Sequence, residues 1–272
     1  MRLERIDDLG DPRVAEYRNL KGGDLLRRRG LFMTEGRLNV QCLIERSRFR
    51  ARSVLVTPKV FEGLRGVLEK LGADSPVYLA PQGVLNGVVG FDLHRGCLAV
   101  GECGELGSLE QVLPAGRVPS LLVVLEALTN HDNTGGVFRN AMAFGADAAL
   151  LCPRCTDPLY RKAIRVSMGA SLCLPFTRFE SWPAGLAELR AAGYSVVALH
   201  PRPEAVELSE LVETAQVPER AALLLGTEGA GISREALAFA DLRVRIGMVP
   251  GFDSLNVATA SGIALYQLAR RR

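Results

Sequence analysis

Polar side chains that could bind a ligand or take part in catalysis gather in three stretches of this chain, each after an apolar run. The first stretch follows Leu121–Leu125 and holds Asn133, Gly135-Gly136 and Arg139. An arginine binds phosphate groups and stabilises developing negative charge. Two adjacent glycines at a helix N-terminus would let backbone N–H groups approach an anion. We therefore expect the first stretch to contact an anion or a nucleotide, with a tight turn capped by an asparagine as the alternative.

The second stretch places three glycines around one acid, in the order Gly226-Thr227-Glu228-Gly229-Ala230-Gly231. Similar glycine spacing occurs in dinucleotide-binding loops, but a central carboxylate would repel a pyrophosphate. A neutral or cationic ligand group is therefore expected here.

The third stretch precedes the C-terminal helix and holds Asp253, Ser254 and Asn256. A single short polar residue is enough to cap a helix N-terminus. Capping therefore explains one of the three residues and leaves the others available for a binding role.

The elements that position these stretches are apolar runs of strand length, which alternate with segments of helix length. Such runs predict buried parallel strands, and strands alternating with helices favour an open α/β sheet. Ligands bind at the carboxyl ends of the strands in such sheets, where the three stretches lie. The predicted strands are Leu121–Leu125, Ala148–Leu151, Ser195–Leu199, Ala221–Leu225 and Leu242–Ile246.

The chain before residue 121 reads as a separate small α/β domain. We expect helices over residues 12–29, 37–46 and 59–71, and strands over residues 31–33, 53–56, 77–79 and 97–100. Residues 106–120 are rich in Gly, Pro and Ser and read as a linker. The expected organisation is thus a first domain over residues 1–105, the linker, and a second domain over residues 121–272.

Composition limits the class of protein. With 48% hydrophobic and 23% charged residues, the 272-residue chain can bury a sizeable core. No apolar run approaches the ~20 residues that span a bilayer, and the first residues lack the apolar centre of a signal peptide. We therefore expect no membrane association and a cytoplasmic location.

The six cysteines lie at spacings that do not suggest a disulfide framework, which fits a reducing compartment. Cys152 and Cys155 form a C-x-x-C pair, but a zinc site would need a second pair at the usual spacing. We expect no metal site and interpret the pair as small apolar thiols at a strand end.

Positive charge is concentrated near the N-terminus. Residues 18–52 contain ten basic and three acidic side chains, whereas the whole chain has a net charge of only +3. Such a zone is typical of a protein that binds a phosphate backbone, although a solvated helix face would give the same pattern. The candidate substrate-binding residues in this zone are Arg18, Arg27, Arg28 and Arg29.

The three stretches together resemble the three motifs of the SpoU/TrmH branch of the SPOUT RNA methyltransferases. The matching segments are "NHDNTGGVFRNAMAFGA", "LLLGTEGAGIS" and "RIGMVPGFDSLNVATASGIALY", with "DPLYRKAIRVSMGASLCLPF" between the first two. The resemblance covers most of residues 121–270. The first domain is similar to the family's smaller substrate-binding domain, which has a ribosomal-protein-like α/β fold.

This resemblance implies a parallel sheet whose C-terminal part is threaded into a deep trefoil knot, although knots are otherwise nearly absent from proteins. It also implies S-adenosylmethionine bound in the knot and an active site at a homodimer interface. The implied reaction is methyl transfer to a ribose 2′-hydroxyl in transfer or ribosomal RNA.

The resemblance also assigns roles to single residues. Arg139 matches the arginine that activates the hydroxyl, but arginine is a poor base with a pKa of about 12.5 or more, so stabilisation of the alkoxide is the preferred hypothesis. Asn133 would orient Arg139 or the ribose, and Glu228 would orient or pair with a basic group. Ser254 and Asn256 would position the substrate or brace the knot. The implied cofactor contacts are Gly226, Thr227, Ile246, Met248 and Leu255.

The chain departs from the family pattern at two places, Asn130-His131 and Ile246-Gly247-Met248, where the family commonly has a proline. Without the proline, the backbone of both loops is less restricted, so the target nucleotide can differ from that of the best-known members. His131 is an alternative base, against the interpretation of a solvent-facing loop histidine.

Two alternatives remain open at this point. The substrate can be transfer or ribosomal RNA, and a first domain of about a hundred residues favours structured ribosomal RNA because it adds shape recognition. The protein can also be a non-catalytic RNA-binding or ribosome-assembly protein on the same fold. A nicotinamide-dependent oxidoreductase is disfavoured because Gly135-Gly136 lacks the glycine spacing of a dinucleotide fingerprint.

Overall fold

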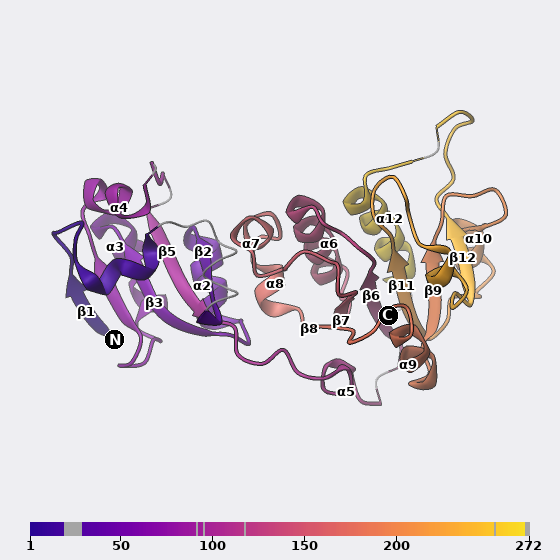
Figure 1. Ribbon diagram of the computed structural model, residues 1–272, viewed down its shortest axis with the longest axis horizontal. Helices are drawn as coiled ribbons and strands as arrows, with labels where there is room; N and C mark the ends of the chain where they lie inside the picture. Colours follow the sequence, from indigo (N-terminus) through magenta and orange to yellow (C-terminus); the bar gives the residue numbers. More distant parts are fainter. Residues whose placement is uncertain (19–28, 91, 95, 117, 253, 270–272) are drawn as a thin grey trace. The chain divides into compact units, whose positions relative to one another are not determined.

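The computed structural model, shown in Figure 1, describes residues 1–18, 29–90, 92–94, 96–116, 118–252 and 254–269. The chain divides into two compact units. The first consists of Met1–Glu105 and Leu159–Cys173, and the second of Leu106–Pro158 and Leu174–Arg272.

The first unit is built on a five-stranded sheet in the order β1-β4-β3-β5-β2. β4 pairs with β1 and β3, and both pairings are parallel. β5 runs antiparallel to both β2 and β3. β2, β3 and β4 therefore end at the same edge of the sheet. The strands are β1 (Arg2–Arg5), β2 (Leu31–Glu35), β3 (Arg50–Val56), β4 (Pro76–Leu79) and β5 (Cys97–Glu102).

Helices cover both faces of this sheet. Alternate strand residues such as Met33, Leu55 and Leu98 share one core with η1 and α4, while α2 and α3 contact each other and the neighbouring strands. The helical elements are η1 (Pro12–Tyr17), α2 (Arg37–Glu45), α3 (Pro58–Leu68), α4 (Gln82–Val89), α7 (Arg161–Val166) and α8 (Ala170–Cys173).

The expected helix over residues 12–29 is wrong in its first part, and its residues 19–28 lie outside the described residues. A short 3-10 helix ends at Tyr17, and Arg18 has extended backbone. Tyr17 is fully buried and its hydroxyl lies 2.7 Å from Ser53 Oγ, so packing against the sheet stops the helix there. β1 and α4 were not expected, because β1 is short with three of its four residues charged, and α4 carries two glycines, which weaken helix propensity.

The second unit is built on a seven-stranded sheet in the order β10-β12-β9-β11-β6-β7-β8, and every pairing in it is parallel. The predicted strands are confirmed to within one residue at each end, and the interior ones are buried on both faces as their apolar runs predicted. The strands are β6 (Ser120–Leu125), β7 (Ala148–Leu151), β8 (Phe176–Arg178), β9 (Ser195–Leu199), β10 (Val206–Glu207), β11 (Arg220–Leu225) and β12 (Leu242–Arg245).

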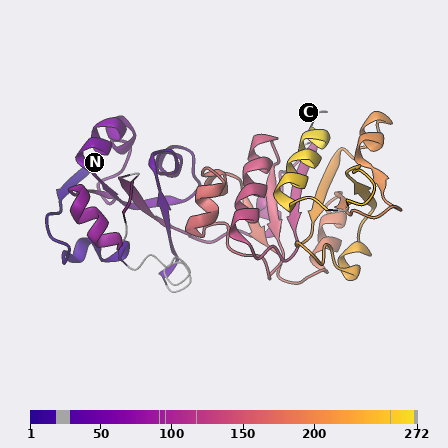
Figure 2. The same cartoon turned by 90° about the horizontal axis from the view of Figure 1, so that it is seen from above.

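Two long helices, α6 and α12, lie side by side in this unit (Figure 2). Residues of α5, α9 and α11 form a core with alternate residues of the strands. None of the helices that the structure describes is long and apolar enough to cross a membrane. The helices are α5 (Leu109–Val112), α6 (His131–Ala143), α9 (Gly185–Ala191), α10 (Leu208–Glu213), α11 (Arg234–Leu237) and α12 (Val257–Ala269).

The expected linker contains structure of its own. Ser108 and Gln111 form a reciprocal capping box at the start of α5, and Val112 is buried in the core that α9 shares. Residues 106–112 therefore belong to the second unit and are held by apolar burial.

The segment Leu159–Cys173 belongs to the first unit although its neighbours in sequence belong to the second. Ser47 Oγ donates a hydrogen bond to the Leu172 carbonyl at 3.0 Å, and the Cys42 and Cys173 Sγ atoms lie 2.9 Å apart. The buried Glu35 carboxylate lies 3.2 Å from the Arg165 guanidinium. The expected second domain over residues 121–272 is thus interrupted, because these contacts draw the segment to α2 and β2.

Candidate functional site

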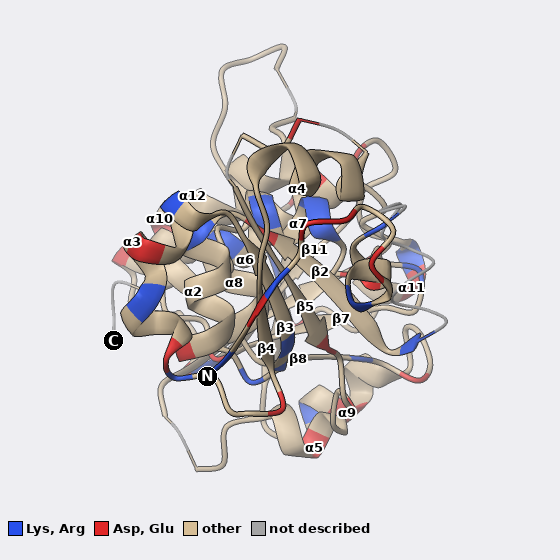
Figure 3. Ribbon diagram, turned by 90° about the vertical axis from the view of Figure 1, so that its left-hand side faces the viewer, with Lys and Arg blue, Asp and Glu red and all other residues tan. Residues whose placement is uncertain are grey.

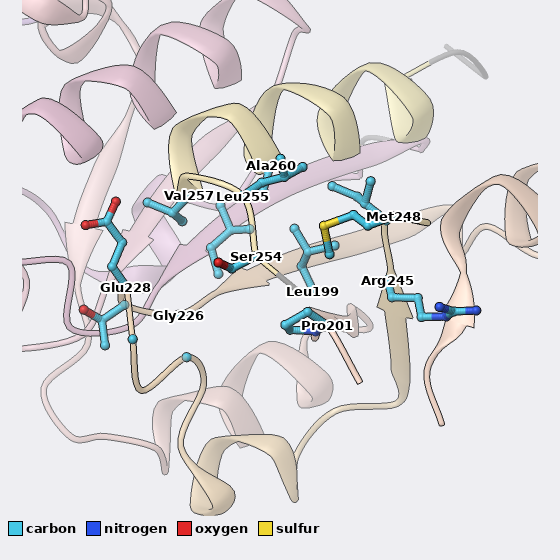
Figure 4. Close-up of a pocket in the computed structure, with 15 residues that line it drawn as sticks. Leu199, Pro201, Gly226, Glu228, Arg245, Met248, Ser254, Leu255, Val257 and Ala260 are labelled. Atoms are coloured by element: carbon cyan, nitrogen blue, oxygen red, sulfur yellow. The ribbon is translucent and has the colours of Figure 1, made fainter. Parts of the chain in front are cut away.

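A cavity lies at the carboxyl ends of β9, β11 and β12 (Figure 4). This is the edge of a parallel sheet at which ligands bind. Its volume is about 150 Å³, and an apolar cavity of about that size holds one aromatic ring. It is lined by Leu199, Pro201, Leu225, Gly226, Thr227, Glu228, Gly229, Gly231, Arg245, Ile246, Met248, Ser254, Leu255, Val257 and Ala260.

The five residues expected to contact a cofactor, Gly226, Thr227, Ile246, Met248 and Leu255, all line this cavity. Leu199, Pro201, Val257 and Ala260 also line it but were not expected. Leu199 ends a predicted strand, so the rule that pointed to the other strand ends would have found it too. Val257 and Ala260 lie in the first turn of α12, which only the tertiary structure brings over the cavity (Figure 4).

The loop after β11 is held in a tight conformation. A Cβ atom at Gly226 would overlap the backbone of Gly231 and Ile232. Gly231 N donates a hydrogen bond to the Thr227 carbonyl at 3.0 Å, and Gly229 and Gly231 have φ values of +85° and +70°. Gly229 and Gly231 are required to be glycine because other residues rarely adopt such backbone angles, whereas Gly226 is required because a side chain would overlap the facing backbone.

Three side chains expected to act in catalysis meet at the rim of the cavity. Asn133 Nδ2 donates to Glu228 Oε1 at 2.7 Å, and Asn256 Nδ2 donates to the same oxygen at 2.9 Å. Asn256 Nδ2 also lies 2.9 Å from Asn133 Oδ1. Asn133 lies in the first turn of α6, Glu228 in the loop after β11 and Asn256 just before α12, so this triangle fixes these three parts of the chain to one another and holds one oxygen of the carboxylate.

Asn256 has a second role at the start of α12. Its Oδ1 accepts hydrogen bonds from Ala258 N at 2.9 Å and Thr259 N at 3.3 Å. The capping interpretation is therefore confirmed for this residue, which at the same time belongs to the triangle with Asn133 and Glu228. Ser254 and Leu255 line the cavity, whereas Asp253 lies outside the described residues.

The expectation that Gly135-Gly136 forms an anion-binding helix N-terminus is wrong. α6 begins at His131 and is capped by Asn130, so both glycines lie inside the helix. A Cβ at Gly136 would come within 2.6 Å of the Ala258 Cβ. Gly136 therefore serves the close approach of α12, to which Asn140 Nδ2 adds hydrogen bonds to Ala258 O at 2.6 Å and Ser261 Oγ at 3.0 Å.

Arg139 lies on the exposed side of α6 and does not line the cavity. Among the described residues its guanidinium has no hydrogen-bond or ion-pair partner. The structure thus leaves this side chain available to a ligand, but it does not join Arg139 to the triangle within one chain.

A buried acid that the sequence did not point to braces the site. Glu126 follows β6 directly and is only 2% exposed. Its carboxylate accepts hydrogen bonds from Trp182 Nε1 at 2.7 Å, Ser233 N at 2.9 Å and Ser233 Oγ at 2.6 Å. These bonds connect the end of β6 to the start of α11, and an acid immediately after an apolar strand was the available signal.

Arg245 and Glu207 form a pair beside the cavity. Arg245 donates to Glu207 Oε1 at 2.8 Å and to the Ala205 carbonyl at 3.2 Å, and Figure 4 shows its guanidinium pointing away from the other labelled side chains. A Cβ at Gly247 would lie 3.0 Å from Glu207 Oε2. The close carboxylate gives a reason for glycine where the family pattern has proline.

Cys152 and Cys155 lie at the end of β7, near the first loop. Ala127 N donates to Cys152 Sγ at 3.1 Å, and Cys155 Sγ lies 3.1 Å from the Leu125 carbonyl oxygen and 3.7 Å from Cys152 Sγ. A hydrogen bond from Cys155 lowers the pKa of Cys152 to about 6. In the part of the chain that the structure describes, no group of three or more potential ligands could hold a metal ion.

The four arginines expected to bind the substrate have different surroundings. Arg18 donates to the Leu9 carbonyl at 2.6 Å and the Asp11 carbonyl at 2.8 Å, which gives it a structural role. Arg29 is exposed. Arg27 and Arg28 lie outside the described residues.

Comparison with known proteins gives consistent matches. The SpoU rRNA Methylase family matches residues 120–266. The chain is 39% identical over 272 residues to an uncharacterized tRNA/rRNA methyltransferase of Mycobacterium bovis, with 98% of this chain and 92% of the relative covered. It is 31% identical over 189 residues to the 23S rRNA (guanosine-2′-O-)-methyltransferase RlmB of Ralstonia nicotianae, with 69% of this chain and 74% of the relative covered.

A solved structure agrees with these matches over the full length. The AdoMet-bound rRNA methyltransferase from Sinorhizobium meliloti aligns with a TM-score of 0.84 at 26% identity, covering 99% of this chain and 98% of that one. The family match includes the first turn of α6, the loop after β11 and the segment before α12, which contribute to the cavity and the triangle described above. The chain therefore belongs to the SpoU rRNA methylase family.

Proposed function

We propose that this protein transfers a methyl group from S-adenosylmethionine to a ribose 2′-hydroxyl of RNA. The observation that carries the proposal is the triangle of Asn133, Glu228 and Asn256 at the rim of the cavity. Family membership supports the methyl transfer and the RNA substrate. The ribose specificity is supported by the name of the RlmB relative.

The cavity fits the adenine part of the cofactor. Leu199, Ile246 and Leu255 provide an apolar lining for a flat ring, and the tight loop from Gly226 presents backbone groups beside it. A site of apolar walls with a few polar groups is typical for a ligand of this kind. S-adenosylmethionine supplies a methyl group on a positively charged sulfur, which suits the neighbourhood of the Glu228 carboxylate.

The residues of the chain would act on the hydroxyl. Glu228 Oε1 is held by two amides, and Glu228 Oε2 has no hydrogen-bond partner among the described residues. That oxygen is available to accept the hydroxyl proton or to hold a guanidinium. Arg139 would stabilise the negative charge that develops on the ribose oxygen, because a preorganised cation lowers the barrier to proton loss.

We propose a homodimer, because Arg139 does not line the cavity of its own chain and a second copy could supply it. Exposed apolar side chains support this assembly, among them Phe252 at 62% and Ile263 at 38% exposure, next to the loop and helix that border the site. After β12 the chain leads into α12, which packs against α6. This path supports the knot that the family resemblance implies. A cytoplasmic location is also proposed.

Ribosomal RNA is the proposed substrate, since the relative RlmB is named for 23S rRNA. The test is transfer of labelled methyl from S-adenosylmethionine into total RNA from cells that lack this protein, with RNA fractions separated by size and the labelled nucleoside identified. We expect label in a ribose-methylated nucleoside of a ribosomal RNA fraction.

Three other outcomes would contradict parts of the proposal. Label in a base-methylated nucleoside would reject the ribose hydroxyl, and label in transfer RNA would reject the ribosomal substrate. Saturable S-adenosylmethionine binding without transfer to naked RNA or to ribosomal particles would favour the non-catalytic RNA-binding alternative.

A further inference from the structure

Two thiols from distant parts of the sequence meet in the first unit. Cys42 Sγ on α2 lies 2.9 Å from Cys173 Sγ at the end of α8, although 131 residues separate them in the chain. Both are free cysteines. A disulfide bond brings two sulfur atoms to about 2.0 Å, so this pair needs a shift of only about 1 Å to form one. The pair can therefore be joined without a large movement of either helix.

Close packing keeps the two sulfur atoms together. α2 and α8 contact each other, and α8 carries no charged residue (Figure 3). A Cβ atom at Gly169 would lie 3.0 Å from Cys42 Sγ, so only a glycine lets the chain come this near to α2. Ser47 Oγ holds the Leu172 carbonyl at 3.0 Å, next to Cys173. The approach of the thiols is thus fixed by neighbouring contacts within the first unit.

The two thiols differ in exposure and in acidity. Cys173 is half-buried, whereas Cys42 is only 8% exposed. The hydrogen bond from Cys42 lowers the pKa of Cys173 to about 7, and the charge of Arg46 acts in the same direction. The same hydrogen bond and burial raise the pKa of Cys42. Because the thiolate is the reactive form, Cys173 reacts first with an oxidant and Cys42 is the second thiol.

The second thiol pair of the chain has a different environment. Cys152 Sγ and Cys155 Sγ lie 3.7 Å apart, and these residues are 0% and 7% exposed. A buried thiol is shielded from oxidants in the solvent, so this pair lacks an accessible first thiol. It provides an internal comparison for the pair of Cys42 and Cys173.

We propose that Cys42 and Cys173 form a reversible disulfide when the protein meets a peroxide, and that this bond tethers the segment Leu159–Cys173 to α2. Cys173 is the last residue of the segment before the chain enters the second unit. In a reducing compartment a disulfide with an accessible sulfur is labile and typical of redox sensing. The proposal does not rest on the proposed function, because it involves neither RNA nor S-adenosylmethionine.

The reaction has two steps, with hydrogen peroxide as the oxidant. The Cys173 thiolate attacks one peroxide oxygen, the O–O bond breaks, and the hydroxide that leaves takes up the proton that Cys173 released, which makes Cys173 a sulfenic acid. Cys42 Sγ then attacks Cys173 Sγ, the S–O bond breaks, and the hydroxyl group leaves as water with the Cys42 proton. In sum, two thiols lose two electrons and two protons, and one peroxide becomes two water molecules.

The test is mass spectrometry of the full chain after treatment with hydrogen peroxide. The reduced protein is oxidised, the remaining thiols are blocked with iodoacetamide, and the chain is digested with trypsin without a reductant. Cys42 then lies in the peptide of residues 38–46 and Cys173 in the peptide of residues 166–178. We expect these two peptides joined by a disulfide as the main oxidised product, and we expect dithiothreitol to separate them.

The variant Cys42→Ser removes the second thiol and keeps the first. The sulfenic acid at Cys173 then has no thiol to react with, so labelling of Cys173 by dimedone, which reacts with sulfenic acids, should rise about fivefold or more over the wild type. Cys155→Ser is the matched control, because it removes one thiol of the other pair and should leave the yield of the disulfide unchanged. Thermal unfolding confirms that each variant is folded.

The tether is tested by limited digestion of the native protein with trypsin. Lys162 and Arg165 are exposed and lie in α7, within the segment that the disulfide would hold. Cleavage there requires local opening, so we expect it to be about threefold or more slower in the oxidised than in the reduced wild type. In Cys42→Ser, peroxide should leave the cleavage rate unchanged.

Three results would overturn the proposal. Sulfinic acid at Cys173 of the wild type without a joined peptide would show that Cys42 does not react. A disulfide formed mainly between Cys152 and Cys155, which trypsin separates at Arg154, would assign the oxidation to the other pair. Equal cleavage of the oxidised and reduced wild type, with the disulfide formed, would reject the tether.

Discussion

At the scale of single residues, Asn256 both caps a helix and holds the candidate catalytic carboxylate. Asn256→Ser keeps a capping oxygen but loses the amide that donates to Glu228. We expect at least a tenfold loss of methyl transfer with little change in unfolding temperature. Asn256→Ala loses both contacts and should also lower the free energy of unfolding by about 1 kcal/mol. Equal activity in Asn256→Ser and the wild type would mean that the triangle does not serve catalysis.

Arg139 has no partner within the described residues, so its substitution should affect turnover and not stability. Arg139→Lys retains the charge but loses the planar fork that could hold a phosphate and the ribose oxygen together. We expect kcat to fall at least tenfold in the methyl-transfer assay. Arg190→Lys on α9, which alters an exposed ion pair with Asp241, is the matched control and should leave kcat unchanged. Unchanged turnover in Arg139→Lys would exclude a bidentate role.

The Cys42 and Cys173 thiols form a coupled pair. A hydrogen bond from Cys42 lowers the pKa of Cys173 to about 7. Because the thiolate is the reactive form, alkylation of Cys173 by iodoacetamide should rise with pH and reach half its maximal rate near that pKa. In Cys42→Ala the midpoint should move up toward the ordinary thiol value of about 8.5. Mass spectrometry of the Cys173 peptide over a pH series measures both midpoints, and identical midpoints would refute the coupling.

At the scale of elements, the packing of α6 on α12 determines whether the loops meet. In Gly136→Ala the added Cβ would lie 2.6 Å from the Ala258 Cβ. We expect this overlap to lower the free energy of unfolding by about 1–3 kcal/mol, although alanine is the better helix former. In the double variant with Ala258→Gly the added methyl group has room, so Gly136→Ala should no longer destabilise. Urea unfolding of the four chains measures this coupling, and strictly additive effects would show that the helices do not touch there.

At the scale of the whole molecule, the segment Leu159–Cys173 belongs to the first unit, although the residues before and after it in the chain belong to the second. It is part of the family match by sequence, yet it packs with the first unit through Cys42, Ser47 and Glu35. We expect a chain shortened to residues 106–272 to become sensitive to proteases within residues 159–173. Limited proteolysis with peptide identification tests this, with α9 as an internal control. Equal protection in the short and full chains would show that the segment is stable on its own.

The sequence by itself determined five of the seven strands of the second sheet and the edge of the sheet at which the cavity lies, but not β8 and β10. Strands such as Leu121–Leu125 are continuous apolar runs, and only burial on both faces allows a run of this kind. The loops after Leu225 and Ile246 follow from those strands, because parallel strands end at a common edge. The prediction was weaker for β1 and α4, whose short or glycine-containing sequences have little intrinsic preference.

Only the tertiary structure decided how distant residues are used. Gly136 looked like part of an anion site, but its lack of a side chain serves α12, which lies more than a hundred residues later in the chain. Arg18 was expected to bind the substrate, and only the tertiary structure shows that its guanidinium donates to the carbonyls of Leu9 and Asp11, which precede η1. The sequence shows which groups are present, whereas long-range packing determines which partner each group meets. That partner decides whether a polar residue supports the fold or remains available to a ligand.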